Sequence, residues 1–244
     1  IVLKISRIIV SRLSSQQQRG NLVGYILKNP AIVWNLLLEH LQMTSLTLIL
    51  ATLIAVPLAL LTTRFRWLNV PILGTLGILY TIPSLALIIL LIPVFGLNAY
   101  SVIAAMVLYT QVILVRSLVV GLQSIPPAIL EAATGMGMSL WQRWWQVQVP
   151  LTLPIFLAGL RLAAIVAIAI ATIGAKFGAG GLGTLLFEGI AQAGRYDKIW
   201  AGAITVSLLA FTVNGVIVAL ENHTNPAQQT PTPLRRRETT FPSL

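Results

Sequence analysis

The chain has 244 residues, of which 57% are hydrophobic and only 9% are charged. A soluble domain of this length carries far more charge because its surface faces water, so the composition excludes an ordinary soluble protein. A net charge of +10 could suggest a nucleic-acid partner, but a DNA-binding face needs a concentrated basic stripe. Here the basic residues are spread over the head, the loops and the tail, so no nucleic-acid partner is expected. The absence of cysteine excludes disulfides and thiolate metal sites.

Five apolar stretches are long enough to cross a bilayer, whose hydrocarbon core of about 30 Å needs roughly 20 helical residues. The stretch 21–38 is interrupted by Lys28-Asn29-Pro30, which predicts an interfacial helix rather than a sixth span. The sequence therefore predicts an all-α membrane protein with a basic head and interfacial helix, a transmembrane domain and a disordered tail rich in Pro, Thr, Gln and Arg. These three parts cover residues 1–38, 39–221 and 222–244, and the spans cover about 44–63, 72–95, 99–116, 153–175 and 198–219.

The placement of arginines predicts the orientation in the membrane. Arg64 and Arg66 follow the first span, Arg143 follows the third, and Arg235-Arg236-Arg237 follow the fifth. With five spans these regions share one side, so we expect a multi-pass inner-membrane protein with its N-terminus outside and its C-terminus inside. The basic head would then lie outside, where it rests on the membrane surface, crosses as an extra segment, or is not part of the natural protein. Its basic residues are Lys4, Arg7, Arg12 and Arg19.

The connection 117–152, on the predicted cytoplasmic side, has helix signals of its own. Pro126-Pro127 mark a helix start, and Gly137 is suited to ending that helix in the left-handed conformation. A Ser-x-x-Gln capping box at 139–142 begins a second short helix, which Pro150 is expected to end. The loop is thus predicted to hold two short helices joined by a glycine elbow.

The same loop reads Glu131-Ala132-Ala133, three residues, Gly137, nine residues and Val147-Gln148-Val149-Pro150. This pattern resembles the EAA motif of permease subunits of binding-protein-dependent ABC importers, in which Ile-x-Leu-Pro stands where this chain has Val-x-Val-Pro. The resemblance implies the five-helix core of a type I ABC importer permease, with a coupling-helix loop that inserts into a separate ATPase subunit. The ATPase-coupling residues are then Glu131, Ala132, Ala133, Gly137 and Pro150.

A plainer interpretation of the same loop is an amphipathic helix at the membrane surface. Trp141, Trp144 and Trp145 would anchor it there, because indole rings favour the membrane interface. The complete spacing of the motif favours the coupling interpretation.

From about residue 39 to residue 221 the chain resembles the osmoprotectant branch of these permeases, which imports glycine betaine, choline and carnitine. The resemblance implies transport by alternating access, an extracytoplasmic solute-binding protein, a second permease copy in a homodimer, and no cofactor. An importer of another small solute, such as an amino acid, is the alternative, and an ATPase-independent channel or membrane scaffold is the remote one. The segments that carry the resemblance are 40–42, 80–87, 131–161 and 178–183.

Several polar or helix-breaking residues within the spans are expected to line the translocation path, since a proline frees a carbonyl group and lets a helix bend. Helix packing alone explains them about as well. They are Tyr80, Pro83, Ser84, Tyr109 and Thr172.

The run 178–183 formally matches G-x-G-x-x-G. A dinucleotide site would also need a preceding strand and a following helix in a βαβ unit, whereas this run follows a membrane span on the predicted outer side. We therefore expect a flexible turn in which Gly180, Gly181 and Gly183 face the solute receptor.

No catalytic residue and no metal site is expected, because His40 and His223 are isolated in the sequence. Arg161, about two turns into the fourth span, is either functional or snorkels to the cytoplasmic interface. The spans lack the carboxylate or histidine pairs of a proton-coupled transporter, and the chain lacks the G-x-x-x-x-G-K-[ST] sequence of a P-loop. Both observations favour energy supplied by another chain.

Overall fold

The computed structural model describes residues 22–192 and 195–224, and these residues form helices and no strand. The all-α fold class is thereby confirmed. The head through Arg19 and the tail beyond residue 224, on which the predictions about topology and disorder partly rest, lie outside the described residues.

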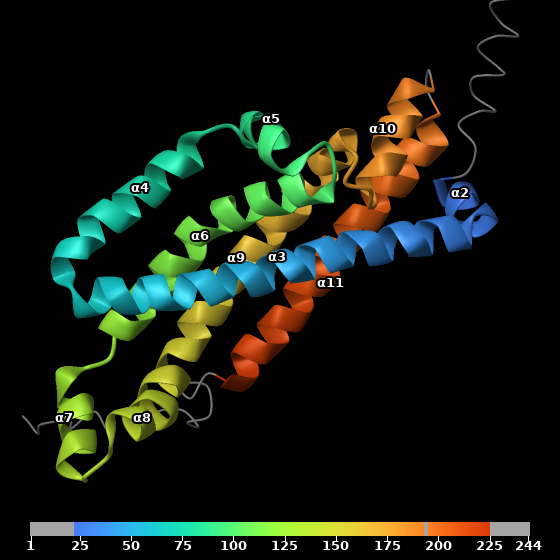
Figure 1. The fold of residues 1–244 in the computed structure, drawn as a ribbon. Coiled ribbons are helices and arrows are strands. Elements are labelled where there is room, and N and C mark those ends of the chain that lie inside the picture. Colours follow the sequence, from blue (N-terminus) through green and yellow to red (C-terminus); the bar gives the residue numbers. More distant parts are fainter. Residues whose placement is uncertain (1–21, 193–194, 225–244) are drawn as a thin grey trace, which may run out of the picture.

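Four helical segments are long and apolar enough to cross a membrane (Figure 1). They are α3 (Pro30–Arg64), α6 (Ala99–Gln123), the segment Leu140–Phe177 and α11 (Tyr196–Thr224). The segment Leu140–Phe177 consists of α8 (Leu140–Arg143), the π-helical turn η2 (Trp144–Gln148), α9 (Val149–Gly174) and the 3-10 turn η3 (Ala175–Phe177). The remaining elements are α2 (Leu22–Lys28), η1 (Arg66–Leu68), α4 (Asn69–Thr81), α5 (Ser84–Phe95), α7 (Pro127–Gly135) and α10 (Gly183–Ala191).

The predicted second span, 72–95, is divided into α4 and α5, which are bent by 99° relative to each other. The break lies at Ile82 and Pro83, whose backbones are extended with ψ values of 127° and 134°. A proline disfavours the helical conformation of the residue before it, so Ile82 leaves the helix. The two pieces together make the fifth segment that could cross a membrane.

The predicted interfacial helix over 21–38 corresponds only in part to a separate helix. The chain breaks at Asn29, as the Lys28-Asn29-Pro30 sequence suggests, but Pro30 occupies the first turn of α3 and the helix runs on for 35 residues. At 1.5 Å per residue this helix is about 52 Å long, so it extends well beyond the thickness of a bilayer core. The short helix α2 packs against α11.

The centre of the bundle is α6, which packs against α3, α5, α4 and α9. In its most apolar 18-residue window 67% of the residues are buried, compared with 11% in α11. A stripe of small residues on α3, Ala51, Ala55 and Ala59, meets larger side chains of α6 in one buried cluster. Gln111 of α6 also donates a hydrogen bond of 3.0 Å from its side-chain amide to the Ala51 carbonyl. Small residues of this kind let two membrane helices approach closely.

The contact between α6 and α9 is closer still. A Cβ atom added to Gly159 of α9 would overlap the side chain of Ser117, and one added to Gly174 would overlap Val102. At the other end of the pair, a Cβ on Gly121 of α6 would lie 2.7 Å from the Thr152 methyl group. These three positions therefore accept no larger residue without a shift of the helices.

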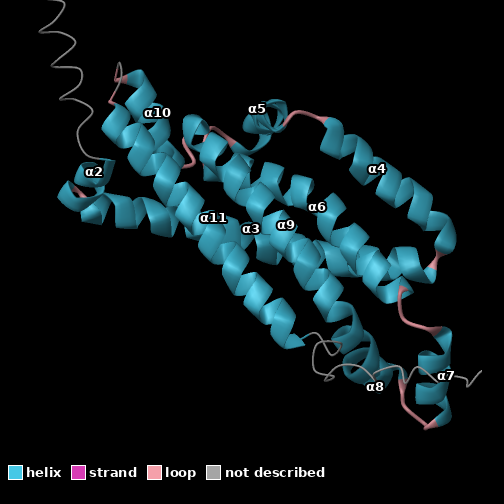
Figure 2. Cartoon of the chain, turned by 180° about the vertical axis from the view of Figure 1, so that it is seen from behind, coloured by secondary structure: helices cyan, strands magenta, loops and turns pink. Residues whose placement is uncertain are grey.

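The connections gather at two opposite ends of the bundle (Figures 1 and 2). The turn between α7 and α8 lies at one end, which we call the elbow end. The glycine-containing turn before α10 lies at the opposite end, near α5. The two loops singled out by the sequence are therefore separated by the whole bundle.

We expect Gly159→Ala to destabilise the bundle by about 1–3 kcal/mol, the usual cost of overpacking a core. The purified protein should show a melting temperature several degrees lower, followed through the fluorescence of its six tryptophans. The matched control is Gly215→Ala in α11, an exposed position where an added Cβ meets nothing within 4 Å, so the better helix former should leave stability unchanged or raise it. Equal melting temperatures for the two variants would contradict the close approach of α6 and α9.

Candidate functional site

The turn at the end of α7 has the hydrogen bonds of a Schellman motif. The Gly137 N–H bonds to the Thr134 carbonyl at 3.0 Å, and the Met138 N–H bonds to the Ala133 carbonyl at 3.2 Å. Gly137 itself has a φ of +80°, which a residue with a side chain adopts only at a cost. The sequence prediction that glycine forms this elbow agrees with the backbone, with α7 ending at Gly135.

Two further interactions fix the start of α8 relative to α7. The Ser139 hydroxyl accepts from the Gln142 N–H at 3.3 Å while the Gln142 side chain accepts from the Ser139 N–H at 2.8 Å, which completes the predicted capping box. Across the elbow, Arg143 Nη1 donates to Thr134 Oγ1 at 3.0 Å. The two short helices are thus connected both through the backbone and through side chains.

The residues of the EAA pattern lie on different sides of α7. Ala133 is 2% exposed, whereas Glu131 and Ala132 are exposed. Glu131 borders a hollow of about 340 Å³ that is also lined by Thr134 and Arg143, and within the described part of the chain its carboxylate forms no ion pair or hydrogen bond. An exposed, unpaired carboxylate beside a hollow is available to a basic group of another protein.

The prediction that Pro150 ends the second short helix is wrong. Pro150 lies in the first turn of α9, directly after the π-helical turn η2, and the chain stays helical through it. Between α8 and α9 the backbone makes the single π-helical turn η2 rather than a break, so the elbow passes directly into a membrane-crossing helix. Turns of this type are often found at functional sites.

The structure brings together four of the five residues expected to line the path. Pro83 and Ser84 form the bend between α4 and α5, and Tyr80, one turn before it, contacts Tyr109 of α6 with ring centroids 5.4 Å apart. Tyr80 is 43% exposed and Tyr109 is 8% exposed. Thr172 shows no such contact, since its hydroxyl donates to the Ile168 carbonyl of its own helix.

The glycine turn is packed against α3. The Gly181 N–H donates to Glu39 Oε2 at 2.9 Å, and Gly181 has a φ of +77° with the His40 ring directly beside it. Gly181 and Gly183 are buried, whereas Gly180 is half-buried. The glycines predicted to face a receptor therefore also have a packing role inside the chain, and receptor contact at this turn stays a prediction.

Sequence reasoning missed two charged residues that hold helices together. Glu39 bonds to the glycine turn, and Glu221 Oε2 of α11 lies 3.9 Å from Arg161 Nη1 of α9. Arg161 thus has an acidic neighbour in a partly exposed pair, for which only about 0–1 kcal/mol of stabilisation is expected. The sequence did contain a signal for both residues. The chain has only six Asp and Glu residues, and a carboxylate in or near a membrane span is costly unless it is paired or functional.

Charges at the end opposite the elbow are paired locally. Lys198 Nζ lies 2.9 Å from Glu188 Oε2 and thereby joins α11 to α10. Arg195 forms a two-bond pair with Asp197, and this hydrogen-bonded carboxylate raises the pKa of the Arg195 guanidinium. Among the described residues no three His, Asp or Glu side chains are grouped as a metal site.

The structure is thus a helical bundle of membrane-spanning length, with the elbow at one end and the glycine turn at the other. The chain belongs to the family described as "Binding-protein-dependent transport system inner membrane component", whose family model matches residues 41–226. It is therefore a multi-pass inner-membrane permease subunit that works with an ATPase and a solute-binding protein.

Relatives with assigned functions resemble most of the chain. The osmoprotectant import permease protein OsmW of Salmonella typhimurium (strain LT2) is 37% identical over 204 residues, which cover 82% of this chain and 94% of that protein. The carnitine transport permease protein OpuCB of Listeria monocytogenes is 34% identical over 77% of this chain and 86% of its own length. The glycine betaine/carnitine/choline transport system permease protein OpuCD of Bacillus subtilis (strain 168) is 34% identical over 87% and 92%.

Solved structures share the fold at lower identity. The MetNI methionine ABC transporter in an inward-facing conformation superposes with a TM-score of 0.70 and 19% identity, covering 80% of this chain and 96% of that chain. An amino acid ABC transporter with histidines gives a TM-score of 0.66 at 17% identity, covering 82% and 97%. The type I importer permease architecture predicted from the motif is thereby confirmed.

We expect Gly137→Ala to weaken ATPase association at least about fivefold, because a left-handed alanine costs about 1–2 kcal/mol. The matched control is Gly135→Ala, two residues earlier, where the backbone is not left-handed and an added Cβ meets nothing within 4 Å. The measurement is the binding of the purified ATPase to each permease variant in nanodiscs. Undiminished binding by the Gly137 variant would show that the elbow is not the coupling element.

Proposed function

We propose that the chain is the permease of an importer for an osmoprotectant of the quaternary ammonium type, such as glycine betaine, carnitine or choline. The assignment of the solute class is supported by the 34–37% identity to three osmoprotectant or carnitine permeases over most of each chain. Import of an amino acid is the second candidate, because structures of methionine and amino-acid transporters share the architecture. Their identity is below 20%, so they support this alternative through the fold alone.

In this proposal the elbow carries the ATP-driven movement to the bundle. Glu131 pairs with a basic group of the ATPase, while Ala132 permits close approach of the partner. The Schellman turn at Gly137 and the bond from Arg143 to Thr134 keep the elbow a single unit. Because η2 joins it to α9 without a break, displacement of the elbow displaces a membrane helix. The ATPase then favours one of two bundle states by contacting them differently.

The translocation path lies between two copies of the chain. Support comes from α4, which has no buried residue of its own and whose Gly74 and Gly77 have open space beside them. A second copy would cover this face. Tyr80, which is 43% exposed and contacts the buried ring of Tyr109, presents aromatic surface to a passing cation, a favourable contact for quaternary ammonium groups.

The end of the bundle opposite the elbow faces the solute receptor. The exposed part of the turn at Gly180 and the paired charges of α10 and α11 lie at this end. With the ATPase bound at the elbow, the N-terminus lies outside and the C-terminus inside.

The solute assignment is tested by uptake in cells that lack their own osmoprotectant importers and express the complete transport system. We expect accumulation of labelled glycine betaine, carnitine or choline, and a decrease of at least about tenfold with Glu131→Arg. The matched control is Gln123→Arg, an exposed position at the end of α6, which should leave uptake near the wild-type rate. Uptake of methionine in place of these compounds would favour the second candidate.

The orientation is tested by cysteine labelling, for which the cysteine-free chain is a ready background. Met136→Cys at the elbow, where the side chain is 75% exposed, should react with an impermeant maleimide only after the cells are opened. Lys176→Cys, an exposed position at the opposite end, should react in intact cells. The reverse pattern would overturn the orientation and, with it, the contact between elbow and ATPase.

A further inference from the structure

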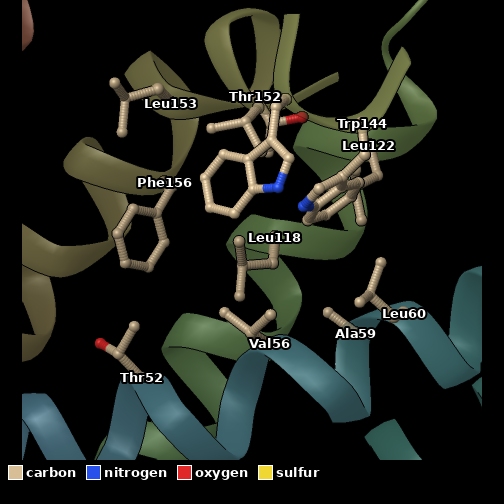
Figure 3. A pocket seen from close by; sticks show the side chains of 12 residues that line it. Thr52, Val56, Ala59, Leu60, Leu118, Leu122, Trp144, Thr152, Leu153 and Phe156 are labelled. Atoms are coloured by element: carbon tan, nitrogen blue, oxygen red, sulfur yellow. The ribbon is translucent and has the colours of Figure 1, made fainter. Parts of the chain in front are cut away.

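An apolar pocket of about 320 Å³ lies between α3, α6 and the first turns of α9 (Figure 3). Thr52, Val56 and Leu60 form its wall on α3, and Leu118 of α6 faces them. Trp144 and Phe156 enclose it from the side of η2 and α9. The pocket therefore adjoins the turn through which the elbow continues into the membrane.

Water is a poor occupant of this space. A buried water needs two to four polar partners, and an enclosed apolar cavity of about 150 Å³ stays dry. The lining side chains are apolar except for the two threonine hydroxyls and the indole N–H groups. The Thr152 hydroxyl is buried and has no hydrogen-bond partner among the described residues, so it leaves a single orphan polar group on an otherwise apolar part of the wall.

The position of the pocket along α3 matches one leaflet of a bilayer. From Thr52 to Arg64 the helix rises about 18 Å, at 1.5 Å per residue. This is close to half of a hydrocarbon core of about 30 Å together with the start of the headgroup region. Of the residues that line the pocket, Leu60 and Trp145 are 36% and 51% exposed, so the pocket is open to an exposed apolar surface of the bundle.

An unpaired charge lies at the headgroup end of the pocket. Arg64 follows Leu60 by four residues and therefore lies on the same face of α3, one turn nearer the membrane surface. Arg64 is exposed, and within residues 22–192 and 195–224 it has no ion-pair partner. A phosphate is the complementary group that membrane lipids supply in abundance at this depth.

We propose that the pocket binds one acyl chain of a phospholipid from the leaflet at the elbow end, with the lipid phosphate at Arg64. An apolar cavity of about 150 Å³ holds benzene, so a pocket of this size accommodates a chain segment of roughly a dozen carbon atoms. The occupant is lipid because the space is apolar, opens at hydrocarbon depth and ends at a basic side chain.

The lipid would act on coupling through η2. This turn lines the pocket with Trp144 and Trp145 and continues into the elbow on its other side. An acyl chain that fits the pocket better in one position of η2 stabilises that position of the turn. Because such coupling is reciprocal, the position of the elbow also changes the affinity of the pocket for the lipid.

The test uses the complete permease–ATPase complex in nanodiscs that contain a phosphatidylethanolamine with a photoreactive diazirine in its acyl chain. We expect cross-links, located by mass spectrometry, to concentrate on peptides that contain Leu122 and Trp144–Phe156. Thr52→Phe, which fills the pocket, should lower this labelling at least about tenfold. Leu53→Phe, on a neighbouring side chain that is 66% exposed, should not change it.

The proposed contact between Arg64 and the lipid phosphate is tested with a second pair of variants. Arg64→Gln should lower the labelling several-fold, whereas Arg66→Gln, beyond the end of α3, should leave it near the wild-type level. Each variant must keep the melting temperature of the parent complex, and Leu122→Trp replaces Thr52→Phe should the latter fail to fold.

Two results would overturn the proposal. One is labelling spread evenly over the lipid-facing helices and unaffected by filling the pocket. The other is a photoreactive residue at Trp145 that cross-links to the second permease copy or the ATPase instead of lipid. Neither readout requires solute or receptor, so failure here would leave the proposed solute class standing.

Discussion

The architecture depends on the close approach of α6 and α9, which small residues permit at three levels along the pair. Gly159 lies against Ser117, Gly174 against Val102, and Gly121 against Thr152. Within a membrane, apolar side chains gain little from leaving lipid, so helices associate through close packing. The alanine stripe of α3 and the bond from Gln111 to the Ala51 carbonyl attach a third helix to this pair. Helices α4 and α11 contribute few buried residues and surround this core.

A tightly packed pair joined to an exposed elbow is suited to transmitting movement. The bonds that hold the elbow connect residues no more than nine positions apart, so all of its hydrogen bonds lie within the elbow itself. It continues through η2 into α9, which is the helix packed most closely against α6. In the proposed mechanism, a force applied at α7 would reach the α6–α9 pair through this continuous helical connection.

Local signals in the sequence were sufficient for the elbow and for the helical class. Gly137 and the Ser139–Gln142 box act over a few residues, and hydropathy reports apolar length directly. Hydropathy did not reveal the bend at Pro83, because an average over a window of residues is the same for a straight apolar helix and for a broken one. Pro150 was misread because proline fits the first turn of a helix as well as it ends one. The bond from Gly181 to Glu39 spans 142 positions, and no pattern in a single sequence relates residues so far apart.

The two ends of the bundle thus differ in how they are held, and this difference bears on the mechanism. At the elbow end the bonds within the elbow are local, and the one charged link between helices is the partly exposed Arg161–Glu221 pair at 3.9 Å, whereas the opposite end is tied across elements by the shorter Gly181–Glu39 and Lys198–Glu188 interactions. Glu39 lies on α3, Gly181 follows α9, and the lysine pair joins α10 to α11. An end with more links between helices changes shape less readily than one with fewer links. We infer that movement delivered at the elbow rotates the helices about their linked end, and that α4, which has no buried residue of its own and is separated from α5 by the bend at Pro83, is the element most free to follow that rotation.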